Sequence, residues 1–300
     1  MKTKVASQVV MIEPRSFCSN PETAASNAFQ NLDQALGRKQ ILQKAQEEFL
    51  FFQNTLREKG IQVLSFIEDE TQNTPDAIFP NNWFCHLPNG KAVVFPMFAE
   101  NRQREIRADV LESLGAKSIL DLSTLTQQKE FLEGTGSLIL DHTNHVAYAC
   151  HSPRTTQQAL QIFSEKVGYR VQAFSAVDGN GQPIYHTNVM MALGISTAVV
   201  VLESIQNPIE KEALIDSLTK AGKTIVDISF QQMKNFVGNM LLLKNKNDQH
   251  FWICSSQAFK NLTIENKKIL EADGEFLFAP LETIETYGGG GARCLLAEVF

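Results

Sequence analysis

Residues 137–167 read SLILDHTNHVAYACHSPRTTQQALQIFSEKV and contain the pattern that sets the fold class. Two strand-length apolar runs, 137–140 and 146–150, are separated by a short polar turn and are followed by a helical pattern over 153–167. A serine and then a proline open this helical pattern, as expected for an N-cap residue and the first helical position. The stretch therefore predicts two paired strands followed by a helix.

The same order recurs along the chain. Further strand-length runs occupy residues 9–12, 92–95, 197–202, 225–228, 240–243, 251–254 and 295–300, and further helical patterns occupy residues 22–34, 40–59, 101–114 and 208–221. This order predicts an α/β or α+β protein built from repeated small units. No linker rich in Pro, Gly or Ser divides the chain, so we expect a single domain over residues 1–300. No glycine-rich phosphate-binding motif follows the first strand, which counts against nucleotide binding.

The composition excludes several classes of protein. The formal net charge is −6, and no basic cluster offsets it, which argues against nucleic acid as a partner and favours a small molecule. No segment approaches the roughly 20 apolar residues needed to cross a bilayer. The five cysteines contain no CxxC pair and indicate neither a disulfide framework nor a zinc ribbon. We therefore expect a cytoplasmic protein with free thiols.

Near its C-terminus the chain has a cysteine that follows a run of glycines, YGGGGARC at residues 287–294. Four consecutive glycines are costly to order, but they let the backbone approach a ligand closely and leave N–H groups free to face an oxyanion. Cys294 stands where the chain would re-enter the core, so it is the candidate nucleophile. Arg293 would point to the opposite face of a strand. The alternative is a flexible tail with a buried core cysteine.

Two further residues, each ahead of an apolar run, are candidate acid/base groups. His186, in YHTNVMM at residues 185–191, lies at a boundary between loop and core, and its pKa near neutrality suits proton transfer. Glu133, in EGTGS at residues 133–137, is a carboxylate on a glycine-rich approach to a strand, where it would orient an imidazole or bind a substrate nitrogen. For each residue taken alone, a structural role is the alternative: a satisfied core histidine or an exposed turn.

A polar and aromatic segment, DAIFPNNWF, is a candidate binding site for a planar polar group. Its residues Asp76, Asn81 and Asn82 offer both hydrogen-bond donors and acceptors. The alternative is an Asx-type turn.

Arginines at the start of the pattern over 101–114 are candidates for binding a substrate carboxylate. Arg102 or Arg104 would pair with it through two hydrogen bonds, and a solvated helix start is the alternative. The histidines show no metal-ligand spacing. We expect no metal and no other cofactor.

Taken together and in this order, these segments resemble the guanidino-group-modifying superfamily, which contains arginine deiminases, dimethylarginine dimethylaminohydrolases and amidinotransferases. The likeness is greatest to the bacterial arginine-deiminase-related branch that includes citrulline ureidases, also called citrulline-utilisation hydrolases. The stretches that carry it are residues 20–25, 76–83, 102–105, 133–137, 152–155, 186–188 and 288–294. They span nearly the whole chain, and their ordered set is far more specific than any one of them.

The resemblance implies the pentein fold, a five-bladed α/β propeller of ββαβ units around a central channel that holds the active site. In that family the nucleophile is the cysteine after the C-terminal glycines, which matches Cys294. The catalytic histidine matches His186, and the acidic residue of an E-G-G-D-like motif matches Glu133. The aspartate of a D-x-x-F motif, which is a substrate ligand, matches Asp76.

The departures from the family pattern favour a neutral substrate. Arginine deiminases have an aspartate two residues after the catalytic histidine, where this chain has Asn188. Dimethylarginine hydrolases have an acidic pair after the D-x-x-F segment, where this chain has Asn81 and Asn82. The aspartate of E-G-G-D is also replaced. A buried carboxylate opposite a neutral ureido group would be an unpaired charge, so these amides favour citrulline over arginine, although Asp76 still offers one anionic contact.

The expected activity is therefore cysteine-dependent hydrolysis of a ureido or guanidino amino acid, citrulline first, through a covalent Cys294 intermediate with His186 as acid and base. Glu133 would orient the histidine, Asp76 and the asparagines named above would hold the planar head, and one of the two arginines would anchor the α-carboxylate. The alternatives are an arginine deiminase, a dimethylarginine hydrolase-like enzyme or an amidinotransferase. A non-catalytic amino-acid-binding protein is the alternative from a different class. The sequence leaves open whether the chain forms a homodimer.

Overall fold

The computed structural model describes residues 4–24, 26–30 and 36–300, and within them the strands form five sheets of three strands each. The strands are β1 (Gln8–Glu13), β2 (Gln62–Ile67), β3 (Phe84–His86), β4 (Lys91–Val94), β5 (Ser118–Asp121), β6 (Ile139–Asp141), β7 (Val146–Cys150), β8 (Arg170–Phe174), β9 (Met191–Leu193), β10 (Thr197–Val200), β11 (Thr224–Asp227), β12 (Leu241–Lys244), β13 (His250–Ser255), β14 (Glu275–Ala279) and β15 (Ala297–Val299). The sheets are β15-β1-β2, β3-β4-β5, β6-β7-β8, β9-β10-β11 and β12-β13-β14.

Each sheet repeats one pattern. The middle strand of each sheet pairs antiparallel with one neighbour and parallel with the other. We call the antiparallel neighbours the inner strands (β15, β3, β6, β9 and β12) and the parallel neighbours the outer strands (β2, β5, β8, β11 and β14). Two parallel neighbours need a crossover connection of about a dozen residues or more, and helices supply it in every sheet. The α-helices are α1 (Pro21–Ala24), α2 (Arg38–Glu58), α3 (Glu100–Gln103), α4 (Ala108–Ser113), α5 (Gly134–Ser137), α6 (Gln157–Val167), α7 (Pro208–Lys220), α8 (Phe230–Lys234), α9 (Ser256–Asn261), α10 (Ile264–Leu270) and α11 (Glu282–Gly288).

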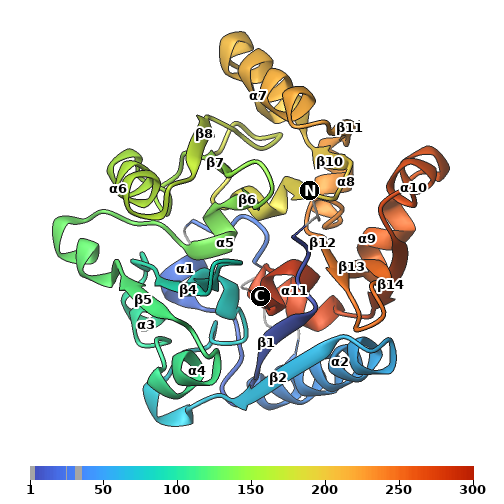
Figure 1. The fold of residues 1–300 in the computed structure, drawn as a ribbon. Coiled ribbons are helices and arrows are strands. Elements are labelled where there is room, and N and C mark those ends of the chain that lie inside the picture. The colour runs from blue at the N-terminus through green and yellow to red at the C-terminus, as the bar shows by residue number, and fades with distance from the viewer. Residues whose placement is uncertain (1–3, 25, 31–35) are drawn as a thin grey trace.

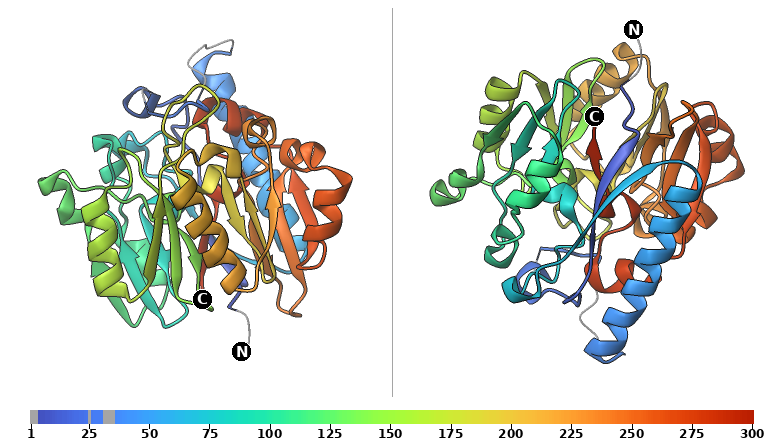
Figure 2. Two further views of the ribbon diagram at one scale, coloured as in Figure 1. Left: turned by 90° about the horizontal axis from the view of Figure 1, so that it is seen from above. Right: turned by 60° about the horizontal axis from the view of Figure 1, so that its bottom comes forward.

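The five sheets surround a common centre, with the crossover helices outside them (Figure 1). Seen from the side, the strands run roughly along the axis of this ring (Figure 2). The C-terminal strand β15 pairs with β1, with Gln8 opposite Val299 and Val10 opposite Ala297, so the two ends of the chain complete one sheet. The expected five-bladed α/β propeller of ββαβ units is confirmed, and the architecture is that of a pentein.

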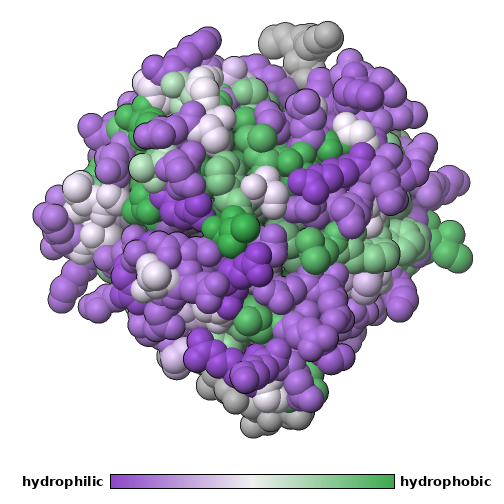
Figure 3. All heavy atoms as spheres, turned by 90° about the horizontal axis from the view of Figure 1, so that it is seen from below, coloured by the Kyte–Doolittle hydropathy of each residue, from purple (hydrophilic) through white to green (hydrophobic). Residues whose placement is uncertain are grey.

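The apolar side chains fill the spaces between the sheets and their helices. Helix α2 buries Ile41, Ala45, Phe49, Phe52 and Leu56, spaced three or four residues apart on one face. This face packs against β14, α11 and the sheet that contains β1 and β2. On the face shown in Figure 3, apolar areas are small and lie between larger hydrophilic ones. Within the described residues, no helix is long and apolar enough to span a membrane.

Three helices differ from their sequence predictions. The pattern over 153–167 gives α6, which begins only at Gln157 with Thr156 as its N-cap residue, so the serine and proline at positions 152 and 153 do not open it. The pattern over 22–34 gives only α1, and residues 25 and 31–35 lie outside the described residues. The pattern over 101–114 gives two short helices, α3 and α4, instead of one. The chain leaves the helical conformation between them, because the backbone of Arg107 is extended, with φ −127° and ψ 121°.

Short helical turns lie before the inner strands and position the polar residues. The turn η2 (Pro80–Asn82) precedes β3, α5 precedes β6, η4 (Thr187–Val189) precedes β9, and η6 (Ala292–Leu295) precedes β15. The other 3-10 turns are η1 (Glu70–Gln72), η3 (Ser123–Gln128) and η5 (Leu202–Ser204). Because the inner strands are adjacent around the ring, these turns bring distant parts of the sequence to the same end of the channel.

Candidate active site

The polar residues that the turns bring together surround a small cavity. It is lined by Asn27, Asp76, Phe79, Asn82, Arg102, Arg154, Tyr185, His186, Gly288, Gly289, Gly290 and Cys294. Cys294 comes from η6, and the glycines before it form the adjacent wall. The candidate nucleophile and the candidate acid/base residue therefore face the same space.

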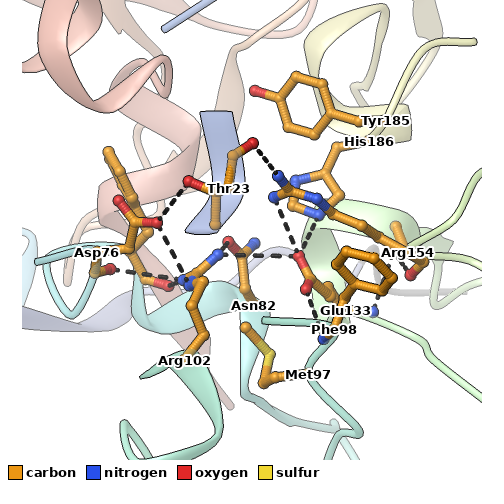
Figure 4. A network of polar contacts seen from close by, with 12 residues as sticks. Thr23, Asp76, Asn82, Met97, Phe98, Arg102, Glu133, Arg154, Tyr185 and His186 are labelled. Atoms are coloured by element: carbon orange, nitrogen blue, oxygen red, sulfur yellow. Dashed lines mark hydrogen bonds and ion pairs between the residues drawn. The ribbon is translucent and has the colours of Figure 1, made fainter. Parts of the chain in front are cut away.

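Glu133 and His186 form the central polar contact of the site. His186 Nε2 lies 2.7 Å from Glu133 Oε2, and both side chains are buried. The second carboxylate oxygen of Glu133 accepts a hydrogen bond from the backbone N–H of Phe98 at 2.9 Å. Figure 4 shows Glu133 at the junction of His186, Arg154 and Arg102. This carboxylate fixes the ring orientation of the histidine.

Burial and neighbouring charges set the protonation of this pair. Burial acts to raise the pKa of Glu133, but the charge of Arg154 and the bond from His186 hold that pKa well below its usual range. Burial lowers the pKa of His186 to about 4, although Glu133 acts in the opposite direction. At neutral pH the glutamate is ionised and the imidazole is neutral. Nε2 then carries the proton that is donated to Glu133, which leaves Nδ1 as a proton acceptor.

The close packing around the pair requires a glycine. A Cβ atom at Gly136 would lie 2.4 Å from Asn82 Nδ2 and 2.9 Å from His186 Nδ1. The glycine-rich motif that contains Glu133 is therefore explained by the close approach of the histidine and the asparagine, and not by flexibility.

Cys294 has a different environment, made of neutral amides. Its side chain is buried, and its Sγ accepts hydrogen bonds from Asn188 Nδ2 and Asn239 Nδ2, each at 3.3 Å. Burial raises the pKa of the Cys294 thiol, while the two amide hydrogen bonds and the charge of Arg293 act to lower it. The side chain of Arg293 turns away to bond the carbonyl of Leu296 and the carboxylate of Glu298. The thiol is therefore protonated at neutral pH when no substrate is present.

Asp76 and Arg102 form the opposite wall of the cavity. Arg102 donates to Glu105 through Nε at 2.8 Å and through Nη2 at 2.9 Å, and to Asn82 Oδ1 at 2.8 Å. Asp76 Oδ2 accepts from Asn20 at 2.7 Å, whereas Asp76 Oδ1 is buried without a hydrogen-bond partner among the described residues. That oxygen is a free acceptor at the edge of the cavity.

Arg154 is a second cation in the cavity. Its Nη2 donates to the Ser26 hydroxyl at 2.7 Å and to the Thr23 carbonyl at 3.2 Å, and its Nη1 lies 3.5 Å from Glu133 Oε2. Its guanidinium also lies over the ring of Tyr185, 4.9 Å from the centroid. These contacts join Thr23 and Ser26 to the wall of the site.

The structure thus places most of the predicted residues together, with three qualifications. Arg104 lies outside the cavity: it is exposed and donates to the backbone carbonyls of Gln72 and Asn73, so the prediction that it anchors a substrate carboxylate is not supported. Asn188 contacts the sulfur and does not line the cavity. Asn81 is buried behind Asn82, to which its Oδ1 is bonded.

Two residues of the site had no assigned role in the sequence. Arg154 belongs to the SPRT stretch that contributes to the family resemblance, so a signal for it was present. Asn239 lies in FVGNMLL, just before β12. Its one signal in the sequence is that it precedes an apolar run, as Asn188 does in HTNVMM. Within the described residues, no group of three or more His, Cys, Asp or Glu side chains is arranged to hold a metal ion.

Comparisons with known proteins bear on this site. A model of the family described as N,N dimethylarginine dimethylhydrolase, eukaryotic, matches residues 13–300. A search of curated proteins finds no match. Among solved structures, apo ArgZ, an arginine dihydrolase from the ornithine–ammonia cycle in Cyanobacteria, is similar with a TM-score of 0.76 and 17% identity. That match covers 97% of this chain and 40% of ArgZ.

Two further structures have the same fold. AgrE in its binary complex with L-arginine has a TM-score of 0.76 and 14% identity, over 99% of this chain and 40% of that chain. DDAH from Pseudomonas aeruginosa complexed with citrulline has a TM-score of 0.67 and 13% identity, over 98% of this chain and 100% of that chain. This chain therefore spans about two fifths of ArgZ and AgrE and the full length of the bacterial DDAH. At these identities the structural likeness establishes the fold alone.

Proposed function

This chain belongs to the N,N-dimethylarginine dimethylhydrolase family, whose model matches residues 13–300, and we propose that it hydrolyses the ureido group of citrulline through Cys294. At the level of the family it is a guanidino-modifying enzyme of the pentein superfamily that acts on non-peptide C–N bonds. The observation that carries the proposal is that Cys294 and His186, whose Nε2 is bonded to Glu133, line the same cavity.

The proposed mechanism moves one proton through His186. The thiol proton of Cys294 passes to the neutral imidazole, and the thiolate forms a bond to the trigonal ureido carbon. The C–N bond then breaks, and the departing nitrogen takes the proton from His186. A water molecule attacks the covalent intermediate and gives a proton to His186, which returns it to the sulfur when the S–C bond breaks. Glu133 stabilises the imidazolium in both halves.

The substrate backbone would be held by the charged groups. An α-ammonium group supplies the donor that Asp76 Oδ1 lacks, and an α-carboxylate finds a cation in Arg154 or Arg102. The planar head then meets Asn82, a neutral amide. A carboxylate at that position would be an unpaired buried charge opposite a neutral ureido group, whereas an amide is not, which is the reason for preferring citrulline.

One observation favours arginine as a second candidate. Asp76 Oδ1 is an unpartnered carboxylate oxygen at the cavity, and it would also serve a cationic guanidinium. AgrE and the bacterial DDAH are described in complex with arginine and citrulline respectively, so ligands of both kinds are bound within this fold.

An end-point assay distinguishes the two. Purified protein is incubated with citrulline and, separately, with arginine, and the products are identified by mass, with Cys294→Ser as the blank. Ornithine from citrulline supports the proposal. If arginine yields citrulline or ornithine while citrulline is not turned over, the proposed ureido hydrolysis is wrong and guanidino hydrolysis takes its place. No product from either substrate favours the non-catalytic binding protein.

A further inference from the structure

Asn239 contacts the reacting atom of the site from a part of the chain that shares no motif with the other site residues. Its Nδ2 donates to Cys294 Sγ at 3.3 Å and to the backbone carbonyl of Asn188 at 2.8 Å. Its Oδ1 accepts from the backbone N–H of Arg293 at 3.1 Å. We propose that Asn239 is a further catalytic residue, which stabilises the thiolate form of Cys294. The inference rests on the proposed role of Cys294 as nucleophile.

The three contacts fix which way the amide of Asn239 points. If the amide were turned over, its oxygen would face the carbonyl oxygen of Asn188, and its NH₂ group would face the N–H of Arg293. Two acceptors and two donors would then oppose one another. The observed orientation satisfies all these groups, so an N–H of Asn239 is held toward the sulfur by the backbone on either side of it.

No cationic side chain hydrogen-bonds to the sulfur among the described residues. The guanidinium of Arg293 is turned to Leu296 and Glu298, and His186 is paired with Glu133. The two hydrogen bonds to Sγ come from Asn188 and Asn239. A thiolate formed in this buried place would therefore depend on neutral dipoles, and hydrogen bonds to an ionised acceptor are roughly twice as strong as neutral ones.

The two asparagines are not equivalent. Asn239 is 1% exposed, and both ends of its amide are bonded to backbone groups. Asn188 Oδ1 is buried without a hydrogen-bond partner among the described residues, so only one end of that amide is fixed. A Cβ at Gly291 would lie 2.8 Å from Asn239 Oδ1, so the last glycine of the run leaves the space that this amide occupies. Asn239 is the donor whose position is set before substrate arrives.

The experiment measures the rate at which iodoacetamide alkylates Cys294, by peptide mass spectrometry between pH 7 and pH 11.5. In Asn239→Ala, we expect the rate at pH 7.5 to fall about tenfold and the midpoint of the profile to move up by about one pH unit. Turnover should fall in parallel. Alkylation needs no substrate, so this result does not depend on whether citrulline is the substrate.

A matched control lies at the other end of the same strand. Asn245 is also buried, donates to the carbonyl of Lys59 at 2.9 Å and has no bond to Cys294. Asn245→Ala should keep an alkylation profile within about twofold of the wild type. If Asn239→Ala does not fold, Asn239→Ser replaces it, because the shorter side chain removes the donor at the sulfur with a smaller change in packing. An unchanged alkylation profile in the folded variant, whatever its turnover, would overturn the proposal.

Discussion

The two halves of the cavity hold reactive groups in opposite ways. In the half lined by Asp76, Arg102 and Arg154, each buried ionic group lies within 3.8 Å of an opposite charge, which for Arg154 is Glu133 behind the lining. In the half around Cys294, both side-chain hydrogen bonds to the sulfur come from neutral amides. A buried ion is tolerated when it is paired, whereas an isolated buried thiolate is not. We therefore propose that the charged half binds the zwitterionic end of the substrate and that the neutral half keeps its thiol protonated until substrate arrives.

The largest expected effect comes from the neutral half. Cys294→Ser should lower turnover by about a thousandfold or more, because a hydroxyl is a far weaker nucleophile than a thiolate at neutral pH. The thermal midpoint should stay close to that of the wild type. Cys18→Ser, a similar change at a half-buried cysteine that does not line the cavity, should keep full activity. Substantial turnover by the Cys294 variant would remove this residue from the mechanism.

The second largest effect on turnover is expected at the contact between Glu133 and His186, which joins the two halves. Glu133→Gln removes the charge that orients His186 and stabilises its protonated form, and it leaves Arg154 without its carboxylate. Steady-state kinetics should show kcat reduced by about a hundredfold or more. Glu100→Gln, on the exposed start of α3, is the control. A variant with unchanged kcat would show that the glutamate has only a structural role.

Arg154 in the charged half and Arg104 on the surface should differ clearly in their effect on KM. Arg154→Gln removes a cation from the cavity wall and should raise KM by about ten- to a hundredfold, as expected for losing a charged hydrogen bond to a carboxylate. Arg104→Gln, on the surface, should leave KM within about twofold. The opposite order of effects would restore Arg104 as the carboxylate anchor and contradict the geometry.

Specificity should respond to a charge moved into the neutral lining. Asn82→Asp places a carboxylate at the cavity, which should shift the ratio of kcat/KM for arginine over citrulline upward by about tenfold. Asn81→Asp makes the same change one residue earlier, behind the lining, and should shift the ratio much less. Equal shifts in both variants would mean that the substrate head does not meet Asn82.

The smallest effect is on stability. The pKa of His186 is lowered to about 4 by burial, below the value near 6.5 expected in the unfolded chain, so the unfolded state binds the proton more readily. The neutral histidine makes its full contribution to the free energy of unfolding above about pH 6.5, and this contribution is lost as the pH falls toward 4. His186 should contribute a loss of about 2 kcal/mol to the free energy of unfolding between pH 7.5 and pH 5, measured in urea as the difference between the wild type and His186→Gln. The comparison with the variant is needed because burial raises the pKa of Glu105 and of Glu285 to about 8, which acts in the opposite direction in both proteins.

His142, another buried histidine, has a pKa lowered to about 3 by burial and adds to that loss. His186→Gln should reduce the pH-dependent loss, and His250→Gln, on β13, should not. The same pH-dependent loss in His186→Gln as in the wild type would contradict the buried neutral imidazole of His186.

The sequence predicted the middle and inner strands of the fold better than the outer ones. Strands such as β7 (VAYAC) are buried at every position and read as continuous apolar runs. The outer strands β2, β5, β8 and β14 were not predicted, because few or none of their residues are buried. The inner strands β3 and β9 were also not predicted, because each has only three residues. Their identity as strands depends on pairing with a neighbour across a helical crossover, which no local pattern contains.

The site shows the same division. Cys294, His186 and Glu133 could be proposed because each stands beside glycines or polar residues ahead of an apolar run, and because their order resembles a known family. Asn239 has no such marker, and its role is visible only when its turn meets Asn188 and Cys294 in space. The exposure of Arg104 also depends on the break between α3 and α4, which the periodicity of the sequence does not show.

The central claim is that citrulline is cleaved through a covalent bond to Cys294, and a trapping experiment tests it most directly. Protein turning over citrulline is quenched in acid and digested, and the peptide containing residue 294 is weighed. We predict an added mass on Cys294 that corresponds to the carbamoyl group left after ornithine departs, or to citrulline less ammonia. This mass should be absent without substrate and absent in Cys294→Ser. Turnover of citrulline with an unmodified Cys294, or an adduct on another residue, would contradict it.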